Sequence, residues 1–340
     1  MKRVFDTVFV FSYGALGDFC ILLYFLNNAH EKMPHARYVV LATRNSDLLR
    51  EMAAEYPFVE IWQINLWNIG QLFLSTFFKR KLFVIPPSFS PTLWFVSVIA
   101  RCLSIFRGTT AGFKSKISNF PYDIGVEFDT RDLFYKNFSR LLTALGIETD
   151  APLILSFKQD SSALEDLGKD YIVLAPFASN PSKSLPPERW AALLKFLYKT
   201  YPERTVVLLG APQDAAVASN FIESAKHMNA RILCGVPFAK TAAIIAHTKC
   251  FIGPDSGLTH VAGVMHVPTV AIENLRNVMW LPYYNPKAIV LFEQKNCLCR
   301  GNGERDCFYE IDGTQYLRCM IDIPQERVEE SITHTLQHHA

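Results

Sequence analysis

The chain has 340 residues, of which 50% are hydrophobic and 19% are charged. This balance excludes a disordered or low-complexity protein, because such chains are poor in apolar residues and rich in charge. The net charge of +2 gives no reason to expect a nucleic-acid partner. At roughly 100–200 residues per domain, the length favours two domains.

No membrane-spanning or targeting segment is expected. Asp6 interrupts the first apolar run, and no small-residue cleavage site follows it. The most apolar stretch, residues 82–106, contains three prolines and an arginine, so it falls short of the ~20 apolar residues of a spanning helix. We therefore expect a cytoplasmic protein whose eight cysteines do not form a disulfide framework.

Short apolar runs alternate with helical patterns through the first half of the chain. Continuously apolar strands that alternate with helices indicate a parallel sheet covered on both faces. Strands are expected at residues 7–12, 38–42, 59–64 and 83–85, and helices at residues 18–29, 46–55, 66–78, 92–106 and 131–145.

The same alternation restarts after a polar, irregular stretch over residues 149–168, which indicates a linker. The chain is thus predicted to be α/β, with two doubly wound, Rossmann-like domains that face a central cleft. We expect these domains at residues 1–155 and 165–325, with a helix and tail at residues 326–340. Second-half strands are expected at residues 171–175, 205–209, 231–233, 250–253 and 269–272, and helices at 187–200, 213–227, 239–247 and 256–264.

The strongest local motif follows the strand predicted at residues 250–253. Asp255 lies at the strand tip, Ser256 is a good N-cap, and Gly257 lets a ligand approach the backbone. The free amides and the dipole of the next helix suit a phosphate group. His260, one turn into that helix, either donates a hydrogen bond to such a group or simply packs. An ordinary capped helix is the alternative for the whole motif.

Two further loops follow predicted strand tips. Lys183 lies in a loop of small residues and can neutralise a phosphate as a point charge, unless it is an ordinary solvated lysine. Gly14 and Gly17 form a tight turn before Asp18, which is either a general base on a rigid element or a carboxylate stabilised by the helix dipole. This turn lacks the third glycine of the dinucleotide fingerprint, which argues against an NAD enzyme.

Four cysteines near the C-terminus follow the pattern C-x-C-x7-C-x11-C. Four thiolates can hold a structural zinc or iron ion, although this spacing is not that of a standard zinc ribbon. Free thiols are the alternative, and the other four cysteines lie in apolar runs that suit the core. The late cysteines are Cys297, Cys299, Cys307 and Cys319.

Residues 61–122 carry seven lysines and arginines, no carboxylate, and many tryptophans and phenylalanines. Basic residues beside aromatic ones suit an anionic membrane surface or an acidic, lipid-linked substrate. A buried sheet with a solvated basic face is the alternative. The cations are Lys79, Arg80, Lys81, Arg101, Arg107, Lys114 and Lys116.

Together these motifs resemble those of glycosyltransferase family 9, the bacterial lipopolysaccharide heptosyltransferases. The family shows a GALGD turn after its first strand, matched at residues 14–18, and a lysine loop that leads into P-P-E-R-W, matched at residues 183–190. It also shows a strand that ends in a glycine loop, matched at Gly210, and the motif G-x-D-[ST]-G-x-x-H, matched at residues 253–260. The late cysteines and residues 320–324 are similar to the family's C-terminal pattern.

The resemblance implies a GT-B fold, with an N-terminal acceptor domain and a C-terminal nucleotide-sugar domain. It also implies an inverting transfer that needs no catalytic metal or cofactor, and the sequence contains no D-x-D motif. By motif, Asp18 is implied as the general base, and Lys183 as the residue that stabilises the leaving diphosphate. The implied donor-binding residues are Gly14, Gly17, Ser179, Gly210, Asp255, Ser256, Gly257, Leu258 and His260.

The implied reaction moves a heptose from ADP-heptose to a lipid A-linked core acceptor, with the enzyme peripheral to the inner membrane of a Gram-negative cell. One departure leaves the donor sugar and base open, because Glu273 and Asn274 stand where the family has a G-x-T loop. Three alternatives remain: a family member with another nucleotide sugar or a protein acceptor, a GT-B-fold sugar-nucleotide epimerase, and a non-catalytic, metal-holding assembly.

Overall fold

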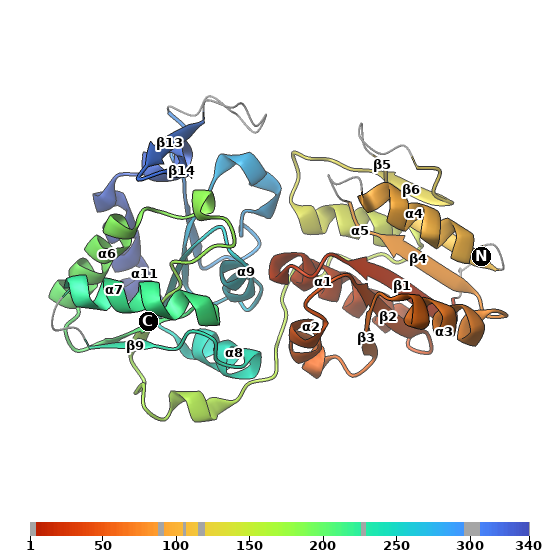
Figure 1. The fold of residues 1–340 in the computed structure, drawn as a ribbon, viewed down its shortest axis with the longest axis horizontal. Helices are drawn as coiled ribbons and strands as arrows, with labels where there is room; N and C mark the ends of the chain where they lie inside the picture. Colours follow the sequence, from red (N-terminus) through yellow and green to blue (C-terminus); the bar gives the residue numbers. More distant parts are fainter. Residues whose placement is uncertain are drawn as a thin grey trace. The chain divides into compact units, whose positions relative to one another are not determined.

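The computed structural model describes residues 5–87, 92–104, 107–114, 120–225, 229–295 and 307–339. The chain divides into two compact units, Met1–Leu155 and Ser156–Ala340. Each unit contains a six-stranded parallel sheet with helices around it (Figure 1). The structure thus confirms the prediction of two doubly wound α/β sheets.

The first sheet has the strand order β3-β2-β1-β4-β5-β6, and all neighbouring strands are parallel. The central strand β1 is buried along its whole length, which is why its sequence is apolar without alternation. The strands are β1 (Thr7–Ser12), β2 (Arg37–Ala42), β3 (Val59–Gln63), β4 (Lys81–Ile85), β5 (Gly108–Lys114) and β6 (Ile124–Glu127).

Helices complete the core of the first unit. Leu72 and Ala100, from two different helices, pack with Phe9 and Phe83 of the sheet in one buried cluster. Elsewhere in the unit, ring contacts such as that between Phe25 and Phe138 join its first and last helices. The helices are α1 (Leu16–Lys32), α2 (Ser46–Met52), α3 (Leu66–Thr76), α4 (Thr92–Leu103) and α5 (Phe134–Ala144).

The second sheet repeats this topology, with the strand order β12-β11-β10-β7-β8-β9. All its neighbouring pairs are parallel as well. The strands are β7 (Tyr171–Leu174), β8 (Thr205–Leu208), β9 (Ala230–Ile232), β10 (Cys250–Pro254), β11 (Thr269–Ile272) and β12 (Ala288–Leu291).

One large apolar cluster holds the second unit together. Trp190 and Leu194 pack with Ile252 of the sheet, and Ile332 of the last helix joins the same cluster. The helices are α6 (Pro187–Thr200), α7 (Ala215–Ala225), α8 (Phe238–His247), α9 (Gly257–Val264), α10 (Arg318–Ile321) and α11 (Gln325–His338), and the short 3-10 turns include η3 (Pro181–Lys183), η4 (Pro212–Asp214) and η5 (Leu275–Trp280).

Several strands have no counterpart in the sequence analysis. β5 contains two glycines that weaken a strand pattern, and Gly112 is required because a Cβ there would meet the ring of Tyr122 at 2.7 Å. A hairpin of β13 (Phe308–Ile311) and β14 (Thr314–Leu317) was also missed. Its turn residues Asp312 and Gly313 both have positive φ, and this Asp-Gly pair is the signal that predicts such a hairpin.

The stretch predicted to be a polar linker is partly packed. Leu153, Leu155 and Phe157 are at most 5% exposed, and the ring of Phe157 contacts that of Phe238 in α8 at 5.2 Å. The backbone of this stretch is irregular, as predicted, as far as a short 3-10 turn at Ser161–Leu164. These apolar residues alternate with polar ones and anchor the segment.

Gly14 is the residue on which the first strand-to-helix turn depends. Its φ is +77°, and a Cβ at this position would collide with the carbonyl oxygen of Arg44. Asn45 closes the turn by donating a hydrogen bond from Nδ2 to the Gly14 carbonyl oxygen at 2.7 Å. The chain can therefore turn toward Asp18 at this point only with glycine.

We predict that Gly14→Ala destabilises the first unit by about 1–3 kcal/mol, because alanine suffers both the positive φ and the collision. Gly70→Ala is the matched control, since no atom lies within 4 Å of its Cβ position in α3. There the free energy of unfolding should rise by up to ~1 kcal/mol. Urea unfolding measures both changes, and equal effects of the two variants would contradict this account of the turn.

Candidate functional site

The order of the second sheet reverses between β7 and β10, and polar loops follow both strands. Lys183 lies in the loop after β7, and Asp255 comes directly after β10. Ligands of open α/β sheets bind outside the carboxyl ends of the strands at such a reversal. The topology therefore brings these two predicted site residues together at the place where a ligand is expected.

Asp255 is the centre of this site. Its side chain is 5% exposed, and its Oδ2 lies 2.9 Å from the Nζ of Lys183. The same oxygen accepts a hydrogen bond from Nδ2 of Asn274 at 2.6 Å. Lys183 remains 31% exposed, so its ammonium group faces both the buried carboxylate and solvent. A buried carboxylate held this firmly presents its free oxygen in a fixed direction.

His260 completes the surroundings of Asp255. Its Nε2 lies 4.0 Å from Asp255 Oδ1, and its ring packs at 5.6 Å from that of Trp280. Burial lowers the pKa of His260, and Lys183 lowers it further, while Asp255 opposes both effects. The neutral imidazole is therefore favoured, and it can donate or accept one hydrogen bond beside the carboxylate.

The first turn of α9 is the place where the sequence predicts an anion site. Ser256 caps the helix by accepting from the Thr259 amide at 3.5 Å, and Thr259 Oγ1 donates to the Pro254 carbonyl oxygen at 2.6 Å. The amides of Gly257 and Leu258 lie in the first turn, where the helix itself offers no acceptor. Both residues are partly exposed, so their amides can serve a bound phosphate.

Two neighbours of Asp255 were not among the predicted site residues. Asn274 is 1% exposed, and besides its bond to Asp255 it accepts from the Arg276 amide at 3.1 Å. Its orientation is fixed because it thereby caps η5. In the sequence, Glu273 and Asn274 stand out only as a departure from the family's G-x-T loop, and the pairing of β11 with β10 brings them beside Asp255.

Glu273 is the second of these neighbours, and it is 1% exposed. Its Oε1 has no hydrogen-bond partner among the residues that the structure describes. Burial raises the pKa of Glu273 well above its ordinary value, and the charge of Asp255 adds to this effect, while Lys183 opposes it. A neutral carboxylic acid is therefore favoured, and it can donate a hydrogen bond that a carboxylate cannot.

The other predicted residues of the second unit lie on the loops after β7 and β8. Ser179 is exposed on the loop that carries Lys183. Gly210 follows β8, where a Cβ would meet the ring of Phe177 at 2.5 Å and Asp214 Oδ2 at 2.9 Å. Because β8 is the neighbour of β7, these loops emerge from the same edge of the sheet.

Gly14, Gly17 and Asp18 belong to the first unit. They follow β1, which lies at the order reversal of the first sheet, between β2 and β4. Gly14 is buried in the turn, whereas Gly17, predicted to share this turn, is buried in the first turn of α1 beside the partly exposed Asp18. This strand-end position in the first sheet corresponds to that of Lys183 in the second.

The late cysteines are described only in part, since Cys297 and Cys299 lie outside the described residues. Cys307 and Cys319 are each 1% exposed and belong to the core cluster of the second unit. The Sγ of Cys319 accepts from the Leu275 amide at 3.4 Å, so it supports the loop that follows Asn274. Within the described ranges, no three potential metal ligands come together.

The basic stretch is less uniform than its sequence indicates. Arg80 pairs with Asp6 at 3.2 Å, and Arg101 pairs with Asp123 at 2.7 Å. Lys81 is 1% exposed and begins a strand, so the prediction that it adds to a basic surface is wrong. Lys116 lies outside the described residues. In the described parts of the chain, no helix is long and apolar enough to cross a bilayer.

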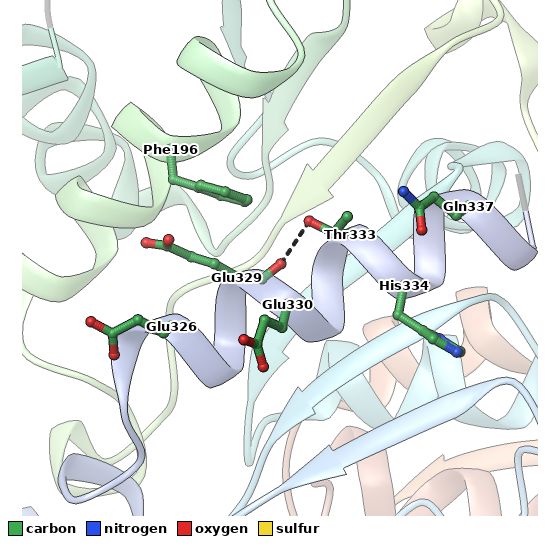
Figure 2. Close-up of a pocket in the computed structure, with 7 residues that line it drawn as sticks. All are labelled: Phe196, Glu326, Glu329, Glu330, Thr333, His334 and Gln337. Carbon is green, nitrogen blue, oxygen red and sulfur yellow. Dashed lines mark hydrogen bonds between the residues drawn. The ribbon is translucent and has the colours of Figure 1, made fainter.

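A hollow of about 340 Å³ between α6 and α11 is a separate feature (Figure 2). Figure 2 shows three glutamate side chains along α11, and the main-chain oxygen of Glu329 accepts from Thr333 Oγ1 at 2.9 Å. Such a surface would repel a diphosphate. None of the predicted site residues lines it. Its lining residues are Phe196, Glu326, Glu329, Glu330, Thr333, His334 and Gln337.

Comparison with known proteins finds similarity in both sequence and fold. The sequence profile described as glycosyltransferase family 9 (heptosyltransferase) matches residues 110–306. Lipopolysaccharide heptosyltransferase 3 of Escherichia coli is 27% identical over 207 residues, which cover 56% of this chain and 60% of that protein. The chain is thus aligned with only part of the length of this relative.

Solved structures share the two-sheet architecture. E. coli ADP-heptose lipopolysaccharide heptosyltransferase II has a TM-score of 0.72 at 19% identity, covering 98% of this chain and 100% of that one. The family 9 glycosyl transferase of Veillonella parvula has a TM-score of 0.74 at 17% identity, covering 99% of each chain. The iron-containing heptosyltransferase TibC of E. coli has a TM-score of 0.61 at 15% identity, covering 99% of this chain and 78% of that one. At these identities the likeness shows the fold, which is GT-B-like.

Glu273→Gln should become more stable relative to the wild type as pH rises from 5 to 8. Because the pKa of Glu273 is raised on folding, the folded protein holds a proton that the unfolded chain releases above the ordinary glutamate pKa of 4.5. The wild type then loses up to ~1.4 kcal/mol of stability per pH unit until the folded pKa is reached. Glutamine has no titratable proton, so the variant does not lose stability in this way. Urea unfolding at several pH values measures the difference between the two proteins.

The exposed Glu310 provides the control for this experiment, because Glu310→Gln changes the same group on the surface hairpin. Its effect on stability is the reference for removing a carboxylate from the surface. A pH-independent effect of Glu273→Gln would show that Glu273 is ionised in the folded protein, contrary to the interpretation above.

Proposed function

Because the chain belongs to glycosyltransferase family 9, the heptosyltransferase family, we propose that it moves a heptose from ADP-heptose to a lipid A-linked core acceptor. The transfer inverts the anomeric carbon and needs no catalytic metal. The observation that carries this proposal is the cluster of Lys183, Asp255 and the first turn of α9 at the strand reversal of the second sheet.

The chemistry of the leaving group explains why these residues occur together. As the bond between the sugar and the diphosphate breaks, negative charge builds up on the diphosphate. Lys183 supplies a cation and Gly257 and Leu258 supply amides, and fixed donors of this kind stabilise the transition state more than the ground state. Asp255 faces the donor sugar in this proposal, and its free oxygen accepts from a sugar hydroxyl.

Asp18 is the proposed general base. The acceptor hydroxyl loses its proton to the Asp18 carboxylate while its oxygen forms a bond to the anomeric carbon, and the bond from that carbon to the diphosphate oxygen breaks. ADP leaves with the electron pair of that bond. Asp18 suits this role because it is partly exposed and lies on a rigid helix behind the Gly14 turn.

The names of similar proteins support adenosine as the donor nucleoside. One similar structure is described as a heptosyltransferase with ADP, and TibC is described as a complex with ADP-D-β-D-heptose. Glu273 and Asn274 depart from the family pattern beside Asp255, so we assign them to the selection of the donor sugar. A different nucleotide sugar or a protein acceptor is the alternative within the family.

A structural metal ion at the late cysteines is a further part of the proposal. Cys307 and Cys319 fit a thiolate site in being buried together at the base of the β13–β14 hairpin. Together with Cys297 and Cys299, they would hold a zinc or iron ion. Such an ion would cross-link the chain segments at the base of the hairpin. TibC is described as iron-containing. The ion has no role in the transfer itself.

We also propose that the enzyme is cytoplasmic and peripheral to the inner membrane, where a lipid A-linked acceptor resides. Sugar-nucleotide epimerases are a second candidate, since a putative UDP-N-acetylglucosamine 2-epimerase of Listeria monocytogenes has a related fold, with a TM-score of 0.50. An epimerase needs no acceptor. Conversion of the sugar nucleotide in the absence of acceptor therefore separates the two reactions.

Asp18→Asn should lower the turnover of ADP-heptose with lipid A-core acceptor by about 10²–10⁴-fold, because asparagine cannot take the proton of the acceptor hydroxyl. Donor binding should be retained. Release of ADP over time measures turnover, and isothermal titration with ADP measures binding.

Asp47→Asn is the control for this change, since Asp47 is an exposed carboxylate in the first turn of α2, in the same unit. It should leave turnover unchanged. An active Asp18→Asn enzyme would remove Asp18 from the mechanism. A wild-type protein that releases ADP from no combination of donor and acceptor would contradict the proposed reaction as a whole.

A further inference from the structure

Helix α3 exposes a line of large apolar side chains to solvent. Trp67 is 74% exposed, Leu74 is 77% exposed and Phe78, just after the helix, is 81% exposed. Trp67 and Leu74 are seven residues apart, which places them on one face of the helix about 10 Å apart, and Phe78 follows just beyond its C-terminal end. Gly70 and Gln71 lie between them on the same face and are exposed as well. We call these five positions the α3 stripe.

The opposite face of α3 is firmly attached to the first unit. Leu72 and Thr76 are each 1% exposed, and Leu72 belongs to the core cluster beneath the helix. At the start of the helix, Asn65 caps the Asn68 amide at 2.8 Å, and Asn68 donates to the Gln63 carbonyl oxygen of β3 at 2.6 Å. Because the inner face of α3 is packed against the first unit, the exposed apolar side chains do not result from a misoriented helix.

Cations lie next to one end of the stripe. Lys79 and Arg80 follow Phe78 directly, and the Lys81 amide bonds to the Arg107 carbonyl oxygen at 3.0 Å, which brings Arg107 beside them. Arg80 is neutralised by Asp6. Lys79 and Arg107 are exposed, and neither forms an ion pair with any residue that the structure describes. α3 itself contains no charged residue.

We infer that the α3 stripe, with Lys79 and Arg107, is the surface by which this protein lies on an anionic lipid bilayer. A helix with an apolar outer face, an aromatic residue at each end and adjacent cations is suited to the membrane interface. Figure 1 shows α3 at the periphery of the first unit, with its outer side free of other elements of that unit. Residues 61–122 contain no carboxylate, and Asp6, which lies beside this end of the stripe, is paired with Arg80.

A lipid surface fits the stripe better than a protein partner does. A large buried side chain contributes about 150–250 Å² of contact. Three such side chains in a line fall short of the ~800 Å² per partner of a standard protein interface. A bilayer needs no shape complementarity, and it attracts the two free cations by charge alone.

The inference rests on the proposed function for the presence of a membrane-borne acceptor, but its test uses neither donor nor acceptor. The full chain is sedimented with phosphatidylcholine vesicles, with and without one quarter phosphatidylglycerol. The stripe variant carries Trp67→Ser, Leu74→Ser and Phe78→Ser. The control variant carries Ile154→Ser, Tyr198→Ser and Val217→Ser, which are also exposed apolar positions, at 53%, 37% and 41%.

The wild type and the control variant should bind the anionic vesicles equally, and the stripe variant should bind at least ~10-fold more weakly. Changing Lys79→Gln and Arg107→Asn together should weaken binding to anionic vesicles by about fivefold per charge and leave binding to neutral vesicles unchanged. Asparagine is chosen because Arg107 has a φ of +55°.

Quenching by lipids with brominated acyl chains identifies the contact directly. Wild-type tryptophan emission should fall on binding, whereas Trp67→Phe should still bind and lose most of this quenching. Equal sedimentation of the wild type and the stripe variant, or no binding by the wild type, would overturn the inference. It would also be overturned by a wild-type dimer that the stripe variant converts to a monomer, because the stripe would then be a contact between copies. Loss of transferase activity with vesicle binding intact would count against the proposed function alone.

Discussion

The buried carboxylate of Asp255 is the constraint on which the second unit's site depends. An ionised group with only 5% exposure is costly unless it is paired and hydrogen-bonded. Lys183 and Asn274 meet this need from the loops after β7 and β11, while Asp255 itself follows β10. Asp255 therefore joins the ends of three strands, and removing either partner would leave only the other to compensate its buried charge.

Few of the groups around Asp255 carry a charge. Lys183 is the cation of the cluster, and the surroundings favour the neutral forms of His260 and Glu273. An ammonium group has three N–H donors, of which Asp255 accepts one, so donors remain for a ligand. The site can thus receive an anionic diphosphate beside α9 without being strongly cationic itself.

The fold and much of the cluster follow from local sequence. The strands β1 and β10 are continuously apolar, and the loops after β7 and β10 carry turn-forming residues, so the two doubly wound sheets and the polar loops at their strand ends were predicted. The ion pair between Lys183 and Asp255 was not predicted. Asn274 and Glu273 could not be recognised in the same way. Their importance depends on the register between β10 and β11, in which Pro254 pairs with Ile272 and places the following residues side by side.

Other differences between sequence and structure have equally local causes. β5 was missed because glycines interrupt it, although Gly112 is required beneath Tyr122. Lys81 was counted as a surface cation, but it begins a strand in the middle of the sheet and is buried. Exposure of the α3 stripe could not be read from the sequence, because large apolar residues occur on more than one face of this helix.

The central claim is that the second unit binds the diphosphate of a nucleotide sugar through Lys183 and α9. Isothermal titration with ADP, AMP, UDP and GDP tests it most directly, with the wild type and Lys183→Met side by side. The account predicts that ADP binds the wild type at least ~10-fold more tightly than AMP, because only ADP offers the second phosphate, and that Lys183→Met removes this advantage. Preference for UDP or GDP would keep the diphosphate site and change the donor. Equal affinities for ADP and AMP, unaffected by Lys183→Met, would contradict the claim.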